Sequence, residues 1–258
     1  MNDSVYKTIG VAFAVCLVCS LLVSISAVSL RELQKENKLN DRRIKVLQVA
    51  DIDIDANKTI AEQFAKLEQK FVNFETGQLM DQYLNFNIDE YDPLMSTKDS
   101  NLSSPVPSSE DIAIIKNREN VGKIFILRDD QGNIDKLILP IRGYGLWGTL
   151  FGYIAIEEDF NTVSGITYYE HKETPGLGAE VDNEKWKKSW IGKKIYQDDK
   201  VALTVIKGNV PNDDPSKLYK INGLSGATIT GRGVSNMIAY WFGSSGYAKL
   251  LEDLDYES

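Results

Sequence analysis

The chain has 258 residues, of which 43% are hydrophobic and 26% are charged, so it can bury one large core or two small ones and is not a disordered tail. Its formal net charge of -8 argues against a nucleic-acid partner, because no basic patch stands out against that acidity. The single histidine, His171, excludes histidine-rich metal sites, and no nucleophile-elbow sequence accompanies it to suggest a hydrolase.

The first predicted element is a membrane helix over residues 9–30. These 22 residues carry no charge. As a helix they would extend about 33 Å, against roughly 30 Å for a hydrocarbon core. A signal peptide is the alternative, but its apolar part would be shorter and would precede a small-residue cleavage site. We therefore predict an uncleaved anchor that follows a short cytoplasmic N-terminus, residues 1–8.

Two other features of this anchor bear on topology and chemistry. One basic side chain, Lys7, precedes it and six follow within residues 31–45, so a literal positive-inside count would leave the large domain in the cytoplasm, which conflicts with the cytoplasmic N-terminus predicted above. Cys16 and Cys19 lie on one face of the helix. We interpret both as small apolar filler rather than a metal or disulfide pair, because the chain offers no further ligands.

Residues 31–120 are predicted to form a helical linker and packing region. Apolar residues recurring among charges indicate that the first helix continues to Val49, and a second amphipathic helix is predicted over residues 59–74. Residues 92–111 contain three prolines among several serines, which is typical of a variable loop.

Residues 121–258 are predicted to form a mixed α+β domain with an antiparallel sheet. Alternating apolar runs on either side of the turn at 129–133 indicate a hairpin. The expected elements are strands at 123–127, 136–139, 140–157, 163–171 and 201–207, and helices at 182–190 and 232–242.

Three loops rich in small residues fall in this domain, at 143–148, 174–178 and 223–228. Glycine within strand and turn sequence usually marks a bulge or a ligand pressed against the backbone. If the loops converge, they form a shallow pocket floored by backbone amides and walled by Trp147 and Leu177, which suits a flat aromatic ring. The alternative for Trp147 is an ordinary core aromatic.

The third loop places the hydroxyl of Thr228 on a turn just ahead of a helix. Gly223 and Gly226 permit positive φ there, and Thr230 is positioned to cap the helix. A phosphate carried on Thr228 would lie near the positive end of that helix, where unpaired N–H groups and Arg232 would meet its charge. The alternative is a turn that only caps a helix.

Three motifs resemble the FMN-binding domain found in the C subunits of sodium-translocating NADH:quinone reductases. They are Gly-Leu-Trp-Gly at 145–148, Glu-Thr-Pro-Gly-Leu-Gly at 173–178 and Ser-Gly-Ala-Thr at 225–228. The single membrane helix and the chain length agree, so the resemblance spans essentially the whole chain. It implies FMN joined to Thr228 by a phosphoester, attached by a flavin transferase that takes FAD and releases AMP. The family usually has aspartate where this chain has Asn222.

The resemblance implies a cofactor site and no catalytic or metal-binding residue. The residues expected at that site are Gly145, Leu146, Trp147, Glu173, Thr174, Leu177, Gly178, Ser225, Gly226, Ala227, Thr228 and Arg232. Trp147 and Leu177 would pack against the isoalloxazine ring, and backbone N–H groups near Gly145 and Thr174 would bond its polar edge. Glu173 is expected to be a positioning or solvated residue, and His171 a hydrogen-bonded loop residue.

The implied function is that of an electron-transfer subunit of the Na(+)-pumping NADH:ubiquinone oxidoreductase in the bacterial inner membrane, with the FMN domain in the periplasm. Its FMN would relay electrons toward quinone between the other membrane, flavin and iron–sulfur subunits, coupled to Na(+) export. Residues 9–30 contain no carboxylate, so this chain is not expected to conduct the ion. Two alternatives stay open: the G subunit of the related ferredoxin-linked electron-transport complex, and a membrane-anchored binding protein without a redox role.

Overall fold

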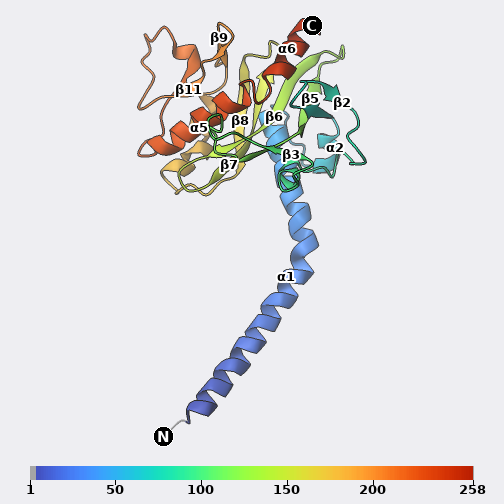
Figure 1. Cartoon of the computed structure of the whole chain (residues 1–258), viewed down its shortest axis with the longest axis vertical. Helices are drawn as coiled ribbons and strands as arrows, with labels where there is room; N and C mark the ends of the chain where they lie inside the picture. The colour runs from blue at the N-terminus through green and yellow to red at the C-terminus, as the bar shows by residue number, and fades with distance from the viewer. Residues whose placement is uncertain (1–3, 258) are drawn as a thin grey trace. The chain divides into compact units, whose positions relative to one another are not determined.

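The computed structural model describes residues 4–257, which divide into a unit ending at Arg42 and a unit starting at Arg43 (Figure 1). The first unit is most of helix α1 (Val5–Val49). Its apolar stretch is exposed and is long and apolar enough to cross a membrane. The prediction of a helix that continues from residue 30 to Val49 is confirmed.

The second unit is built on one six-stranded antiparallel sheet in the order β2-β1-β5-β6-β7-β8. Its strands are β1 (Glu68–Asn73), β2 (Leu79–Met80), β5 (Val121–Arg128), β6 (Ile134–Tyr144), β7 (Thr149–Glu157) and β8 (Val163–Glu170). Strands β5 to β8 follow one another as hairpins, so the predicted α+β class, the antiparallel sheet and the hairpin at 129–133 are confirmed.

Both faces of this sheet are covered. Helix α5 (Thr228–Trp241) lies across one face (Figure 1), where its residues Val234 and Met237 share a core with Ile124 and Leu137. The adjacent strand residues, Phe125 and Ile138 among them, point to the other face and pack with the last turn of α1 and with α2 (Ile60–Phe64). Each strand therefore alternates between two buried layers.

The shorter elements lie between and around these layers. They are α3 (Pro93–Ser96), β3 (Ser103–Pro105), β4 (Asn117–Glu119), η1 (Gly178–Asp182), α4 (Glu184–Lys188), β9 (Tyr196–Gln197), β10 (Lys200–Val201), β11 (Thr204–Val205), η2 (Lys217–Tyr219), β12 (Lys220–Ile221) and α6 (Ala248–Glu257). The single strand predicted at 201–207 is thus wrong, because it contains the end of β10 and all of β11.

The predicted helix over residues 59–74 is wrong in its second half. Helix α2 starts from a capping box at Thr59 and ends at Phe64, and β1 begins at Glu68. Phe71 packs in one cluster while Val72 packs in the cluster on the other side of the sheet, which is the period of a strand. The region predicted to be a helical linker therefore contributes two strands to the sheet.

The predicted strand over residues 140–157 is two strands. Strand β6 ends at Tyr144, the chain reverses over residues 145–148, and β7 begins at Thr149. The reversal is closed by the Gly145 N–H, which donates to the Gly148 carbonyl at 2.8 Å. The first glycine-bearing loop is therefore a hairpin turn at one edge of the domain.

Candidate functional site

Helix α5 begins at Thr228 rather than at residue 232. Its N-cap residue, Ala227, has φ −129° and ψ 46° and supplies no side-chain hydrogen bond. The predicted cap by Thr230 is wrong, because Thr230 is buried inside the first turn and donates its hydroxyl to Glu173. Within the described chain, the first amides of α5 are therefore left without a side-chain acceptor, and the exposed Thr228 side chain lies beside them.

The two glycines of this turn have different roles. Gly226 has φ +70°, in the left-handed region that favours glycine, so that prediction is confirmed. Gly223, which would also permit positive φ, does not adopt it. A Cβ atom on Gly223 would lie 2.4 Å from the Ile206 carbonyl oxygen, so this position is kept small by close packing.

Glu173 connects two of the glycine-bearing loops with the start of α5. Its side chain is buried, and Oε1 accepts hydrogen bonds from the backbone N–H groups of Leu146 at 3.0 Å and Trp147 at 2.9 Å. The other oxygen, Oε2, accepts the Thr230 hydroxyl at 2.5 Å. The Glu173 carboxylate therefore joins the first loop to the first turn of α5, directly after the third loop, and the condition that the loops converge is met.

Glycines surround this carboxylate because larger residues would collide with it. A Cβ atom on Gly145 would lie 2.6 Å from Oε1 of Glu173, and one on Gly178 would lie 2.4 Å from Oε2. Gly233 lets α5 pass over the end of β6, since a Cβ there would lie 2.3 Å from the Tyr144 carbonyl oxygen. The sequence analysis missed Gly233, because it placed the start of the helix at residue 232; in α5 this glycine is an interior position, where glycine is a signal of close approach.

His171 fixes the loop that carries Glu173. Its Nδ1 accepts the Glu173 backbone N–H at 3.2 Å, and its Nε2 lies 2.8 Å from Oδ2 of Asp182. Because Nδ1 is an acceptor, neutral His171 carries its proton on Nε2. This N–H donates a hydrogen bond to Asp182. The expectation of a hydrogen-bonded loop residue is confirmed.

Large apolar side chains are exposed on these same loops. Trp147 is 62% exposed, Leu177 is 44% exposed and Leu146 is 38% exposed. The core-aromatic alternative for Trp147 is therefore wrong. Leu177 lies against the turn at residues 223–228, since a Cβ on Gly226 would be 2.9 Å from the Cδ2 atom of Leu177. A group of exposed apolar side chains of this kind is typical of a binding surface.

A pocket of about 720 Å³ opens beside Thr228. The first two turns of α5, including Arg232, form one wall, and the segment 204–209 with Lys207 forms another. Its volume lies in the range of small-molecule sites, about 300–1,000 Å³, and its two basic side chains favour an anionic ligand. The sequence analysis did not expect residues 204–209 at the site.

The predicted site residues thus fall into two groups. The residues that line the pocket are Ser225, Gly226, Thr228 and Arg232. The second group lies in the loops joined by Glu173 and consists of Gly145, Leu146, Trp147, Glu173, Thr174, Leu177 and Gly178. The Thr174 carbonyl closes its turn by accepting the N–H groups of residues 177 and 179. Ala227 is buried at the start of α5 between the two groups.

Asn222 holds the start of the turn at residues 223–228 in place. Its Oδ1 accepts the Val210 N–H at 2.7 Å, and its backbone carbonyl accepts Nε1–H of Trp186 at 2.8 Å. An aspartate would offer the same acceptor oxygen to Val210. The asparagine therefore keeps the contact that holds the turn against the neighbouring loop.

Comparison with known proteins agrees with this geometry. Residues 145–243 match the FMN-binding domain family. The chain is 41% identical over 258 residues to the C subunit of the Na(+)-translocating NADH-quinone reductase of Pseudomonas aeruginosa, covering 98% of this chain and 97% of that protein. It is also 41% identical to the C subunit of the Vibrio alginolyticus reductase, over 97% of this chain and 95% of that protein.

The fold is shared as well. The crystal structure of Shewanella oneidensis NqrC superposes with a TM-score of 0.78 at 34% identity, covering 86% of this chain and 99% of that chain. The crystal structure of the C subunit from Parabacteroides distasonis gives a TM-score of 0.65 at 28% identity, over 86% and 96% of the two chains. The chain therefore belongs to the family of C subunits of the Na(+)-translocating NADH-quinone reductase.

Proposed function

We propose that this chain is the electron-transfer subunit of a Na(+)-translocating NADH:quinone reductase and that it carries FMN covalently on Thr228. The observation that carries the proposal is the exposed Thr228 side chain at the uncapped start of α5, beside a pocket of ligand size with two basic side chains. The FMN-binding domain match and the names of the relatives support it. When bound, FMN supplies the capacity to accept and pass on electrons.

The start of α5 fits the phosphate of FMN. A phosphodiester keeps one negative charge, which the free N–H groups and the dipole of α5 stabilise. Arg232 lies one turn along the helix and lines the same pocket. It forms no ion pair with any described residue, so its charge is available to the phosphate.

Thr228 is the best acceptor among the three hydroxyls near this turn. Thr230 is buried and its hydroxyl is bound to Glu173, which leaves it inaccessible to a second protein. Ser225 is exposed but precedes Gly226 and is not part of the helix. We propose that a flavin transferase presents FAD, that the Thr228 oxygen bonds to the FMN phosphorus, and that AMP leaves as the hydroxyl loses its proton.

The exposed apolar side chains suit the isoalloxazine ring. Trp147 and Leu177 would contact one face of the ring, and Arg232 would be the counter-charge of the phosphate. An exposed ring on such a shallow surface is held weakly, and a covalent tether prevents its dissociation. The other face then stays accessible to redox partners.

We propose that the FMN relays electrons between other subunits of the complex, that α1 is its single membrane anchor, and that the FMN domain lies in the periplasm. NADH, quinone and Na(+) would be handled by other subunits. The periplasmic side of the membrane is proposed because it is the side implied by the family, whereas the count of basic residues around α1 favours the cytoplasm. A reporter fused after Ser258 that is active only in the cytoplasm would overturn the periplasmic placement.

The G subunit of the ferredoxin-linked complex is not favoured, because the near-full-length relatives are named as C subunits of the quinone reductase.

In-gel flavin fluorescence tests the attachment site. The full chain is coexpressed with a flavin transferase as wild type, Thr228→Ala and Ser225→Ala, and denatured before electrophoresis. Wild type and Ser225→Ala are expected to fluoresce and Thr228→Ala to be dark. Fluorescence of Thr228→Ala at the wild-type level would refute the assignment.

A further inference from the structure

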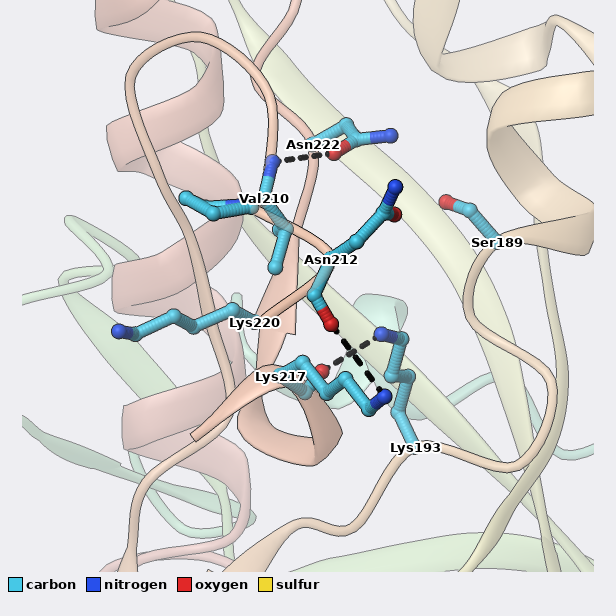
Figure 2. A pocket seen from close by; sticks show the side chains of 8 residues that line it. Ser189, Lys193, Val210, Asn212, Lys217, Lys220 and Asn222 are labelled. Atoms are coloured by element: carbon cyan, nitrogen blue, oxygen red, sulfur yellow. Dashed lines mark hydrogen bonds between the residues drawn. The ribbon is translucent and has the colours of Figure 1, made fainter. Parts of the chain in front are cut away.

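A second pocket, of about 450 Å³, lies between the segment that follows α4 and the loop before Asn222 (Figure 2). Three lysines line it: Lys193, Lys217 and Lys220. None of them belongs to the site described above. A concentration of positive charge in a pocket is unexpected for a chain with a formal net charge of -8.

Two of these lysines face each other without a counter-charge. Lys193 Nζ donates to the Lys217 carbonyl oxygen at 2.7 Å, and Lys217 Nζ donates to the Asn212 carbonyl oxygen at 3.5 Å; the two dashed lines that mark these bonds cross in Figure 2. Neither reaches a carboxylate among residues 4–257, whereas Lys220 is paired with Asp214 at 2.7 Å. The pocket therefore holds two ammonium groups that donate to carbonyl oxygens and have no carboxylate partner among the described residues.

Two like charges this close repel each other in the absence of a ligand. Burial, and then the charge of Lys217, lower the pKa of Lys193. An anion between the two ammonium groups would remove that repulsion. The pocket also offers neutral donors, because the side-chain amides of Asn212 and Asn222 point toward the same opening (Figure 2), and Asn222 uses its Oδ1 rather than its nitrogen to hold Val210.

We propose that this pocket is a binding site for a phosphate-bearing anion, held by the ammonium groups of Lys193 and Lys217 and by the side-chain amide of Asn222. Two adjacent point charges match a group that carries up to two negative charges, and amide N–H groups complete the coordination of its oxygens. A carboxylate carries one charge and would leave one ammonium group unmatched.

The bound anion would contact the segment that leads to Thr228. The Gly223 N–H donates to the Gly208 carbonyl at 2.7 Å, next to the bond from Val210 to Asn222. Gly208 and Gly223 line the pocket beside Thr228, whereas Val210 and Asn222 line the lysine pocket. The two pockets therefore share one wall. The proposal concerns the unmodified chain and does not depend on FMN.

The test follows the Asn222 side-chain amide by NMR in the full chain, held in phosphatidylcholine nanodiscs and titrated with pyrophosphate. The signal is assigned by its disappearance in Asn222→Asp. A saturable shift is expected for the wild type. Lys193→Gln and Lys217→Gln should each raise the Kd about tenfold or more, because each removes a charge-assisted contact.

Lys185→Gln is the matched control, because Lys185 is exposed on α4 and the variant makes the same change in net charge. It should bind pyrophosphate as the wild type does. Equal Kd values for Lys185→Gln and Lys193→Gln would mean that only the overall charge matters, and would overturn the site. Matching amide spectra of the unliganded variants ensure that all of them are folded.

A second arm identifies the source of the phosphate. Phosphatidylglycerol is added to the nanodiscs in the absence of pyrophosphate. A shift of the Asn222 amide that Lys193→Gln abolishes would support the site with a lipid headgroup as its ligand. A shift with pyrophosphate alone would support a soluble phosphate compound. No shift in either arm would refute the proposal.

Discussion

Removing the Glu173 carboxylate is expected to separate the loops of the candidate flavin site. In Glu173→Ala, the partly buried N–H groups of Leu146 and Trp147 and the buried hydroxyl of Thr230 lose their acceptor. Each unsatisfied donor costs about 1–3 kcal/mol, so three would cost about 3–9 kcal/mol. Water entering the space left by the side chain reduces this, and we expect a loss of about 3 kcal/mol.

Glu173→Gln separates the effect of charge from that of shape. Its Oε1 still accepts the two backbone N–H groups, while its Nε2 faces the Thr230 hydroxyl and donates to it. The lost charge assistance is partly offset because a neutral amide is cheaper to bury. We therefore expect a loss of about 1–2 kcal/mol, between the wild type and Glu173→Ala.

The assays are denaturant unfolding and amide hydrogen exchange on the full chain. Unfolding gives the global loss, and exchange at Leu146 and Trp147 reports whether the loop opens locally. Glu158→Ala, at an exposed site in the turn between β7 and β8, is the control and should lie within about 0.5 kcal/mol of the wild type. A cost for Glu173→Ala equal to that of Glu158→Ala, with unchanged exchange at residues 146 and 147, would refute the role assigned to Glu173.

Three further predictions concern stability. Burial raises the pKa of Asp159, but hydrogen bonds from Lys194 and Thr162 outweigh it and lower the pKa from 3.8 to about 2. The ionised carboxylate therefore stabilises the fold above pH 3.8, and this contribution disappears as the pH falls through about 2. Urea unfolding should show Asp159→Asn about 1 kcal/mol less stable than wild type at pH 6 but equal near pH 2. The magnitude allows for the carboxylate being 43% exposed. Gly233→Ala should cost about 1–3 kcal/mol in thermal unfolding, since its Cβ collides with a backbone carbonyl, and a neutral result would mean that α5 shifts freely. Asn222→Asp should keep its bond to the backbone and stay within about 0.5 kcal/mol of wild type, whereas Asn222→Ala should lose about 1 kcal/mol, and equal losses would contradict the acceptor role.

Local pattern predicted the central part of the fold. Apolar alternation on either side of the turn at 129–133 has only one compact solution, a hairpin, and the structure contains it. The stretch 59–74 failed because Phe64, Phe71 and Phe74 also fit a helical spacing. Pairing of β1 with β5 decides between the two, and that contact lies about 50 residues away along the chain.

The candidate site was predictable in its motifs and not in its construction. Three glycine-bearing loops identified the region, because glycine indicates close packing against the backbone even when only one sequence is known. The burial of Glu173 depends on donors from the 145–148 loop and from the first turn of α5, so its own neighbours in the sequence give no sign of it. The wall formed by residues 204–209 was missed for the same reason, since its sequence is that of an ordinary short strand.

The central claim is that Thr228 is the tether of FMN. The most direct measurement is intact-mass analysis with peptide mapping of the full chain, made with and without a flavin transferase, as wild type and as Thr228→Ala. We predict that the wild type gains the mass of one FMN less water only when the transferase is present, that the modified peptide contains Thr228, and that Thr228→Ala gains nothing. Flavin mapped to another residue, or an unmodified wild type under conditions that modify a known acceptor protein, would contradict the account.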